Sequence, residues 1–175
     1  MALGVNKPIL QVTGYQNSGK TTLMAKLIAE AGRQGWTVAS LKHHGHGGTP
    51  DRPKDYKDSE RHRQAGALAA GVEGGGVLQI TAAKTNWRLE EILPLYNSFP
   101  VDLLLIEGYK RAGYPKVVLI KEPHELELLE QLVNVQAVIS WKPIALQQPT
   151  CPVFLLSEEE RYINWFVSYM RNSLV

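Results

Sequence analysis

The sequence predicts an α/β fold, a three-layer sandwich in which helices cover both faces of a mostly parallel central sheet. Three observations support this class. Strand-like segments alternate with segments of helical periodicity along the 175 residues. Several strand segments, residues 101–106 above all, are apolar throughout, as in parallel strands buried on both faces. A glycine-containing loop, residues 14–21, joins the first strand to the first helix.

The first part of the chain predicts two strands with a helix between them. Residues 9–12 form an apolar run that is typical of a buried strand. Residues 36–41 predict the second strand. The intervening helix is indicated by apolar residues at helical spacing that end at two glycines: Leu23, Met24, Leu27, Ile28 and Ala31, then Gly32 and Gly35.

A long loop and a further helix are expected next. Residues 42–57 are rich in Gly, Pro and His and have no apolar period, so they predict a loop. Asp58 or Ser59 is expected to cap a helix that runs to a left-handed stop at Gly71. Three consecutive glycines, residues 74–76, then interrupt the chain.

The second half of the chain returns to alternating strands and helices. Residues 77–81 predict a strand, and residues 89–93 predict a short helix that ends at Pro94. A helix is also expected around residues 125–132, and a final helix should open with a capping box at residues 157–160. The remaining strands are expected at residues 101–106, 116–120, 135–139 and 153–156. The buried side of the final helix would carry Tyr162, Trp165, Phe166 and Tyr169.

Composition predicts one domain over residues 1–175, because a chain of this length that is 44% hydrophobic can bury a sizeable core. The formal charge of +2 is too balanced to indicate a nucleic-acid or membrane partner. Cys151 is the single cysteine, which excludes an internal disulfide or a zinc ribbon and favours a cytoplasmic location. The sequence presents no export signal and no apolar run long enough to span a membrane.

Residues 14–21 match the spacing G-x-x-x-x-G-K-[ST] of a phosphate-binding loop, or Walker A motif. The amino end of the following helix should leave backbone N–H groups unpaired and carry partial positive charge, and both features suit phosphate oxygens. Lys20 is expected to reach the β- and γ-phosphates of a nucleotide, and Thr21 to place its hydroxyl on Mg²⁺. The expected nucleotide-binding residues of the loop are Gly14, Asn17, Ser18, Gly19, Lys20, Thr21 and Thr22.

A carboxylate should orient the metal from the end of a strand next to this loop. Asp102 and Glu107 flank one apolar strand and would lie about 16 Å apart at ~3.3 Å per residue, so only one can lie at the phosphate end. Glu107 is assigned to the metal because it follows the strand, and Gly108 lets the backbone turn closely past a γ-phosphate. Asp102 is expected at the opposite edge as a cap or ion-pair partner.

Carboxyl ends of parallel strands converge, so the residues just after Thr13, Leu41, Ile80 and Ile106 are expected to line one crevice. Lys42 and His43 are therefore added to the nucleotide-binding residues, with Lys42 close to the γ-phosphate. The cluster of His43, His44 and His46 also permits a metal-binding interpretation, although its spacing matches no structural zinc pattern. Asp51, Asp55 and Asp58, and the arginines Arg61, Arg63 and Arg111, are further candidates to which no role is assigned.

With these residues, the chain resembles the MobB family of molybdopterin-guanine dinucleotide biosynthesis proteins along nearly its whole length. The resemblance rests on the phosphate-binding loop through Leu23 and on three further motifs. These are Lys42-His43-His44, the run Lys57-Asp58-Ser59 followed by Ala65-Gly66-Ala67, and Ile106-Glu107-Gly108-Tyr109-Lys110 before Pro115-Lys116. The phosphate-binding loop occurs in many families, but the other motifs together are much more discriminating.

The resemblance implies a GTP-binding protein of the P-loop class that uses Mg²⁺. It implies an adapter role, usually as a homodimer, that assists the guanylyltransferase of molybdenum cofactor biosynthesis. Enzyme activity would be slow GTP hydrolysis at most, and the sequence offers no residue dedicated to orienting the attacking water. No catalytic residue is assigned.

Guanine specificity follows from the family alone, because the segment Ser140-Trp141-Lys142-Pro143 lacks the aspartate of an Asn-Lys-x-Asp motif. Trp141 or Lys142 would cover the base, and a buried strand-end tryptophan is an equal alternative. Two other functions stay open. One is a metallochaperone GTPase of the hydrogenase or urease maturation type, and the other is an ATP-dependent ligase that resembles dethiobiotin synthetase.

Overall fold

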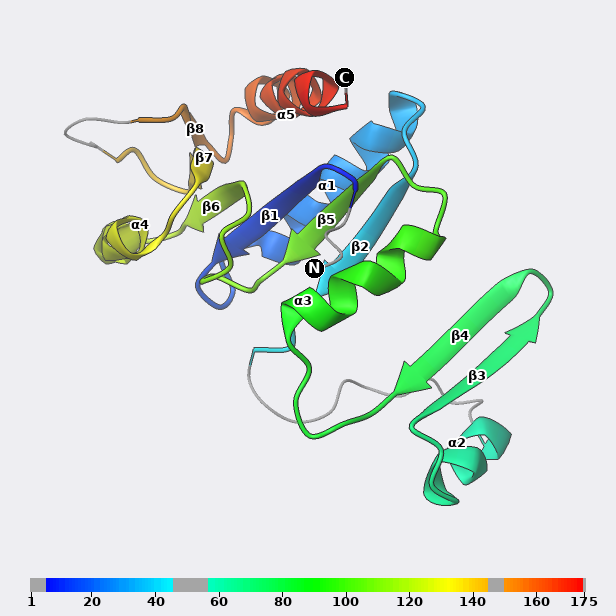
Figure 1. The fold of residues 1–175 in the computed structure, drawn as a ribbon. Coiled ribbons are helices and arrows are strands. Elements are labelled where there is room, and N and C mark those ends of the chain that lie inside the picture. Colours follow the sequence, from blue (N-terminus) through cyan, green and yellow to red (C-terminus); the bar gives the residue numbers. More distant parts are fainter. Residues whose placement is uncertain (1–5, 46–56, 145–149, 175) are drawn as a thin grey trace.

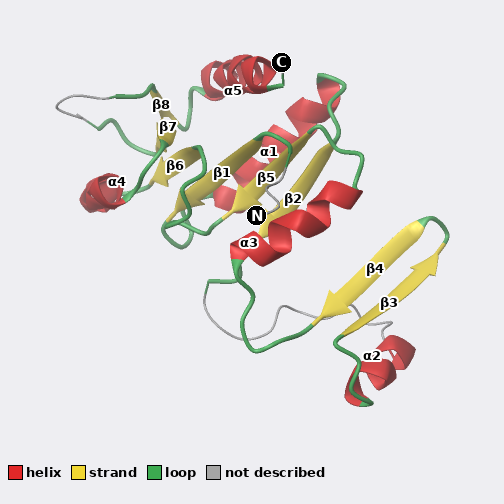
Figure 2. Ribbon diagram, in the orientation of Figure 1, coloured by secondary structure: helices red, strands yellow, loops and turns green. Residues whose placement is uncertain are grey.

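The computed structural model describes residues 6–45, 57–144 and 150–174, and its centre is a six-stranded parallel sheet (Figures 1 and 2). The strands lie in the order β2-β5-β1-β6-β7-β8, and every neighbouring pair is parallel. They are β1 (Ile9–Gly14), β2 (Val38–Lys42), β5 (Leu103–Glu107), β6 (Lys116–Ile120), β7 (Val135–Ser140) and β8 (Val153–Leu155). The predicted fold class is confirmed, and the bounds of these strands agree with the expected ones to within two residues.

Helices α1 (Lys20–Arg33) and α5 (Glu159–Ser173) cover one face of this sheet. Their buried side chains are Leu23, Met24, Leu27 and Ala31 from α1, and Tyr162, Phe166 and Met170 from α5. They pack on alternate strand residues such as Leu10, Val12, Leu103 and Leu105, because successive side chains of a strand point to opposite faces. Trp165 and Tyr169 are partly buried against the same cluster. In the described ranges, no helix is long and apolar enough to cross a membrane.

The opposite face is covered by shorter elements. The helix α3 (Leu89–Ile92) and the 3₁₀ helix η1 (Leu93–Ser98) lie over β1 and β5, where Leu89 and Leu93 pack against Leu104 and Ile106. Over β6 and β7, the 3₁₀ helix η2 (Pro123–Leu126) and α4 (Glu127–Gln131) complete the layer through Leu128. The sheet is therefore enclosed between two helical layers, as expected.

Residues 57–82 form an arm that lies apart from the main sheet (Figure 1). The arm consists of α2 (Lys57–Gln64) and an antiparallel hairpin of β3 (Ala69–Gly74) and β4 (Val77–Ala82). The predicted helix that continues to Gly71 is therefore wrong. Gly66, with φ 109°, follows the helix, and Gly75 and Gly76, with φ 58° and 80°, form the tight primed turn that suits a hairpin.

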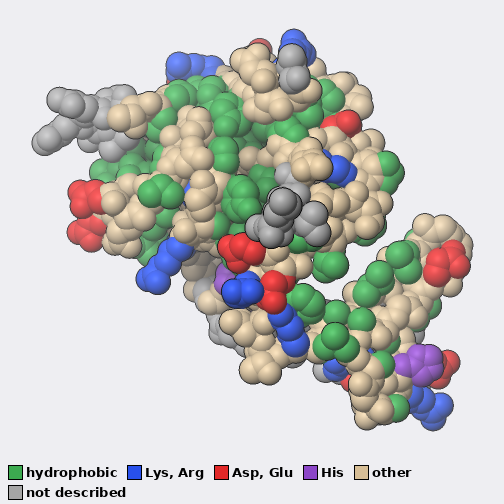
Figure 3. Space-filling model, viewed as in Figure 1, with side chains coloured by type: hydrophobic (Ala, Val, Ile, Leu, Met, Phe, Trp, Pro, Cys, Tyr) green, Lys and Arg blue, Asp and Glu red, His purple; other side chains and the backbone are tan. Residues whose placement is uncertain are grey.

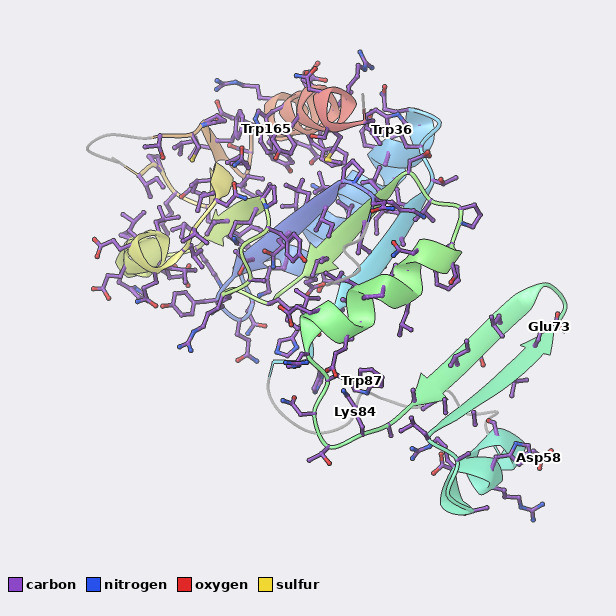
Figure 4. The ribbon with its side chains drawn as sticks, viewed as in Figure 1. Trp36, Asp58, Glu73, Lys84, Trp87 and Trp165 are labelled. Carbon is purple, nitrogen blue, oxygen red and sulfur yellow. The ribbon has the colours of Figure 1, made fainter. Side chains whose placement is uncertain are left out.

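The hairpin also shows that one prediction about the crevice, the position of Ile80, is wrong. Strand β4 pairs with β3 and not with the main sheet, so Ile80 does not reach the carboxyl edge of the parallel strands. Figure 4 shows Glu73 at the far end of the arm, and Lys84 and Trp87 where the chain returns toward α3. The Lys84 ammonium lies 4.5 Å from the Trp87 ring centroid and 2.5 Å from a Glu91 carboxylate oxygen. These contacts fasten the returning chain to α3.

The connection from β5 to β6, residues 108–115, crosses the sheet without a helix. It is held by Lys116, whose side chain is completely buried. The Lys116 ammonium donates to the carbonyl oxygens of Ala112 (2.9 Å), Tyr114 (2.7 Å) and Val133 (2.5 Å). Three carbonyls match the three protons of an ammonium group. Burial nevertheless lowers the pKa of Lys116 from its ordinary value.

Three further helix boundaries differ from expectation. Gly32 lies inside α1, and Gly35, with φ 79°, follows the helix end. The chain stays helical beyond Pro94, because proline fits the first turn of η1. The predicted capping box is not formed at α5, since Glu158 at its amino end provides no side-chain cap and instead accepts a hydrogen bond from the Leu155 amide at 2.8 Å.

Asp102 precedes β5 at the amino-terminal edge of the sheet, where its carboxylate accepts hydrogen bonds from the Thr37 amide (2.7 Å) and hydroxyl (2.8 Å). These bonds hold the pKa of Asp102 below its usual range. A depressed carboxyl pKa stabilises the fold above the unfolded pKa, and the contribution is lost as the pH falls through the folded pKa.

We therefore expect Asp102→Ala to lower the melting temperature at neutral pH, with a deficit that shrinks as the pH approaches about 3. Thermal unfolding followed by circular dichroism across this pH range measures the effect. Asp58→Ala is the control, because the Asp58 side chain is 91% exposed. A deficit that stays constant with pH would contradict the assigned role of the carboxylate.

Candidate functional site

A cleft of about 1160 Å³ opens at the carboxyl ends of β1, β2 and β5. Its walls come from the loop before α1, the residues after β2, residues 107–112, and the side chains of Leu89, Glu90 and Trp141. In open parallel sheets, ligands bind at this edge, where the connections on either side of a strand run in opposite directions. The cleft is therefore the candidate functional site.

The loop of residues 14–19 leads into the amino end of α1. Asn17 and Gly19 take left-handed backbone conformations, with φ 59° and 97°. Gly19 offers no side-chain cap to the helix, and the first backbone bond there runs from the Leu23 amide to the Gly19 carbonyl at 3.0 Å. The amides of the first helical turn thus lack intrahelical acceptors at the positively polarised end of the helix dipole. This end of α1 suits an anion.

Gly14 is required by close packing beneath the loop. A Cβ at this position would lie 2.6 Å from the Leu119 carbonyl oxygen and 2.7 Å from Ser18 Oγ. Gly14 also has φ 150°, a conformation that residues with side chains rarely adopt. Ser18 is completely buried, and its hydroxyl has no hydrogen-bond partner among the described residues. The conformation of the loop therefore depends on its packing against Leu119 and Ser18 as well as on the anion that it would bind.

Lys20 folds back over this loop. Its ammonium donates a hydrogen bond to the Tyr15 carbonyl oxygen at 2.6 Å. Burial lowers the pKa of Lys20, and Lys110 and Lys42 lower it further, whereas Glu107 acts in the opposite direction. An anion placed beside this desolvated ammonium would relieve the repulsion between the cations.

Thr21 and Glu107 meet at the floor of the cleft. The Thr21 hydroxyl lies 3.0 and 3.1 Å from the two carboxylate oxygens of Glu107, a residue that is only 7% exposed. Lys42 pairs with Glu107 in the β2–β5 register, and its ammonium lies 3.2 Å from Glu107 Oε1. A hydroxyl and a buried carboxylate are hard oxygen donors, so these residues fit Mg²⁺, which takes few protein ligands alongside phosphate and water.

His43 packs against the wall of the cleft. Its amide donates to the Glu107 carbonyl at 2.9 Å, and its ring centroid lies 4.3 Å from that of Tyr109. Gly108, with φ 96°, makes room for this packing, since a Cβ there would approach the His43 Cβ to 3.0 Å. His44 also lines the cleft. Within the described residues, no group of three or more His, Cys, Asp or Glu side chains is arranged to hold a metal ion.

Gln11 supports the turn after Glu107, a role that the sequence analysis missed. Its side chain is completely buried on β1, and its amide nitrogen donates to the carbonyl oxygens of Gly108 (3.0 Å) and Tyr109 (3.1 Å). Tyr109 itself has φ 50°, so the turn contains two successive left-handed residues. A glutamine inside an otherwise apolar strand was the available signal, because a buried amide needs a partner.

Trp141, which follows β7, leans on the phosphate-binding loop. Its indole N–H donates to the Ser18 carbonyl oxygen at 2.9 Å, and the side chain is 45% exposed. It is therefore a partly exposed wall of the cleft and not a buried strand-end residue. On the other side of the loop, the Lys110 ammonium lies 4.1 Å from the Tyr15 ring centroid. No role for Tyr15 or Lys110 was predicted from the sequence.

Other candidates lie elsewhere. Asp58, Arg61 and Arg63 belong to α2 in the arm, where each arginine lies within ion-pair distance of an acid three residues earlier in the helix. None of these three residues lines the cleft, whereas Arg111 does. Three candidates, Asp51, Asp55 and His46, lie outside the described residues.

The cleft carries an excess of positive charge. Among its lining residues are the cations Lys20, Lys42, Lys110 and Arg111, and the acids Glu90 and Glu107. The chain as a whole has 19 basic and 17 acidic residues, so its small net charge does not predict this local excess. A cleft with such charges favours a polyanionic ligand.

Comparisons with known proteins show the family to which the chain belongs. Residues 9–141 match the family model of molybdopterin guanine dinucleotide synthesis protein B, MobB. This chain belongs to the MobB family. A Bacillus subtilis relative, described as a probable molybdopterin-guanine dinucleotide biosynthesis adapter protein, is 50% identical over 79% of each chain. A Haemophilus influenzae adapter protein is 30% identical over 90% of this chain and 89% of its own.

Solved MobB structures share the fold. The crystal structure of Bacillus subtilis MobB has a TM-score of 0.79 at 42% identity, covering 92% of this chain and 96% of that one. A MobB homologue from Bacillus stearothermophilus has a TM-score of 0.77 at 39% identity, covering 94% and 98%. The family assignment therefore rests on sequence and on fold.

Gly14→Ala should destabilise the fold by about 1–3 kcal/mol, because the new methyl group would overlap a backbone carbonyl. Urea unfolding measures the loss. Gly32→Ala is the matched control: a Cβ there meets nothing within 4 Å inside α1, so up to about 1 kcal/mol of stabilisation is expected. Equal effects of the two substitutions would show that the packing beneath the loop is not what requires glycine.

Proposed function

We propose that this chain binds GTP together with Mg²⁺ in the cleft and acts as an adapter in molybdopterin guanine dinucleotide biosynthesis. In this role it assists the guanylyltransferase that forms the dinucleotide. Hydrolysis of GTP is slow at most and is not its main task. The relatives described as adapter proteins of this biosynthesis support the assignment.

The observation that carries the proposal is the alignment of three groups around one edge of the sheet. The amino end of α1 offers uncapped amides, Lys20 lies over the loop, and Thr21 meets the buried carboxylate of Glu107. Amides and an ammonium suit phosphate oxygens, while a hydroxyl with a carboxylate suits Mg²⁺. A nucleoside triphosphate with its metal ion needs both sets of groups side by side.

Slow hydrolysis is consistent with the contacts of the Glu107 carboxylate in the cleft. Both oxygens of Glu107 lie within hydrogen-bond distance of Thr21, and one also contacts Lys42. Those contacts suit a group that orients a metal ion and not one that accepts a proton from water. In the adapter role, the chain is expected to act by binding the nucleotide and not by hydrolysing it.

The base is expected to lie near Trp141. This side chain is fixed by its bond to Ser18, and its exposed part is available for stacking against a purine. An aromatic surface does not distinguish guanine from adenine, so the preference for GTP rests on the family. Selective binding of ATP would instead favour a ligase like dethiobiotin synthetase.

Calorimetric titration of the parent with GTP, ATP and GDP in the presence of Mg²⁺ tests this proposal, with GTP expected to bind most tightly. Lys20→Ala should weaken GTP binding by at least about 100-fold, because the ammonium is the flexible cation of the phosphate loop. Lys26→Ala is the control, since Lys26 lies on the same helix but pairs with Glu159. Unchanged affinity in Lys20→Ala would refute the site.

We also propose that the chain forms a homodimer through the arm. Leu78 and Ile80 project from one face of the hairpin and are 56% and 63% exposed. On the other face, Ala70 is buried near α2, whereas Val72 and Val77 are 46% and 58% exposed. Figure 3 shows hydrophobic side chains along the arm. A two-stranded hairpin by itself is only marginally stable in water. Its unpaired strand edges and exposed apolar side chains would be stabilised by contact with another protein surface. A second copy offers an identical surface, so two hairpins complete one another about a twofold axis.

Ile80→Glu should convert a dimer into a monomer, as measured by light scattering after size-exclusion chromatography, because it would bury a charge in the contact. The affinity for GTP should change less than about twofold, since the cleft lies on the main sheet. Leu95→Glu adds the same charge at a leucine of η1 that is 57% exposed and lies outside the arm, and it should leave the dimer intact. A monomeric parent, or a dimer that persists in Ile80→Glu, would refute this contact.

A further inference from the structure

The ammonium group of Lys42 lies between the two groups assigned to the metal ion. It is 3.1 Å from the Thr21 hydroxyl oxygen and 3.2 Å from Glu107 Oε1, and those two residues are themselves 3.0 Å apart. The Thr21 hydroxyl donates to the carboxylate and accepts from the ammonium. Three side chains from α1, β2 and β5 thus form a closed triangle at the floor of the cleft.

Electrostatics explains why a cation occupies this place. A carboxylate that is almost completely removed from water needs a compensating charge. Among the described residues, Lys42 is the cation within ion-pair distance of Glu107, because the Lys20 ammonium is bonded to Tyr15. The Lys42 side chain is 58% exposed, so it reaches the carboxylate from the solvent side and its long stem is free to move away.

We propose that Lys42 is a tethered cation that holds the Mg²⁺ position in the nucleotide-free chain and is displaced when Mg²⁺ enters with the nucleotide. This inference rests on the proposed function of the same site. A divalent ion uses the hydroxyl and carboxylate oxygens that the ammonium contacts, and two cations repel one another at such short range. Binding at this position is therefore an exchange of one cation for another.

The exchange links the metal to the phosphates. After displacement, the Lys42 ammonium stays in the cleft that it lines, where the oxygens of a triphosphate offer the nearest negative charge. Mg²⁺ alone would have to displace the lysine without giving it a new partner, whereas Mg²⁺ with a triphosphate supplies one. Metal and triphosphate should consequently bind with positive coupling.

Titration of the nucleotide-free protein with MgCl₂ alone tests the exchange by calorimetry and by thermal unfolding. Lys42→Met keeps the length of the side chain but removes the charge, so it should bind Mg²⁺ about three- to tenfold more tightly than the parent. Its melting temperature should lie about 2–4 °C below that of the parent without Mg²⁺ and should recover when Mg²⁺ is added. The parent should respond little to Mg²⁺.

Two further variants separate this exchange from a general effect of charge. Lys26→Met also removes a lysine from an ion pair with a glutamate, but away from the cleft, and should gain no affinity for Mg²⁺. Adding Glu107→Gln to Lys42→Met should abolish the gain. If Mg²⁺ raises the melting temperature of Lys42→Met no more than that of the parent, the inference is wrong, while the proposed function stands as long as the parent binds GTP. A parent that does not bind GTP refutes the proposed function, whatever Mg²⁺ alone does.

Discussion

The parallel pairing of β1 with β5 is the constraint on which the site depends. It brings Val12 opposite Glu107, so the loop that follows β1 and the carboxylate that ends β5 open at the same edge of the sheet. The Thr21 hydroxyl then reaches Glu107 across 86 residues of sequence. The neighbouring pairing of β2 with β5 adds Lys42 opposite Glu107. A shift of either register would separate these groups.

Features that depend on short stretches of chain could be predicted from the sequence. The strand, the glycine loop and the helix around Gly19 follow from local periodicity and from the angles that glycine permits. The positions of Asp102 and Glu107 at opposite ends of one strand follow from its length and are as expected. Once the parallel sheet was recognised, the common edge of its carboxyl ends followed from topology.

Features that depend on distant contacts could not be predicted in this way. The alanine- and glycine-rich residues 65–71 carry no clear period, and pairing with the following strand decides that part of them is extended. The bond between Trp141 and Ser18 spans 123 residues, so nothing near either residue indicates it. A glutamine in a buried strand indicates that its amide has a partner, but the carbonyls of Gly108 and Tyr109 that it contacts lie 97 and 98 residues away in the sequence.

Lys116 helps to make one wall of the cleft rigid in its backbone and mobile in its side chains. Its ammonium fixes the carbonyl of Ala112, and Gln11 fixes the carbonyl of Tyr109, so the backbone is anchored just before and just after Lys110 and Arg111. Long basic side chains therefore project from a main chain that is held at both ends. The charged ends of these side chains can reorient toward a ligand that enters the cleft, while the backbone that carries them stays in place.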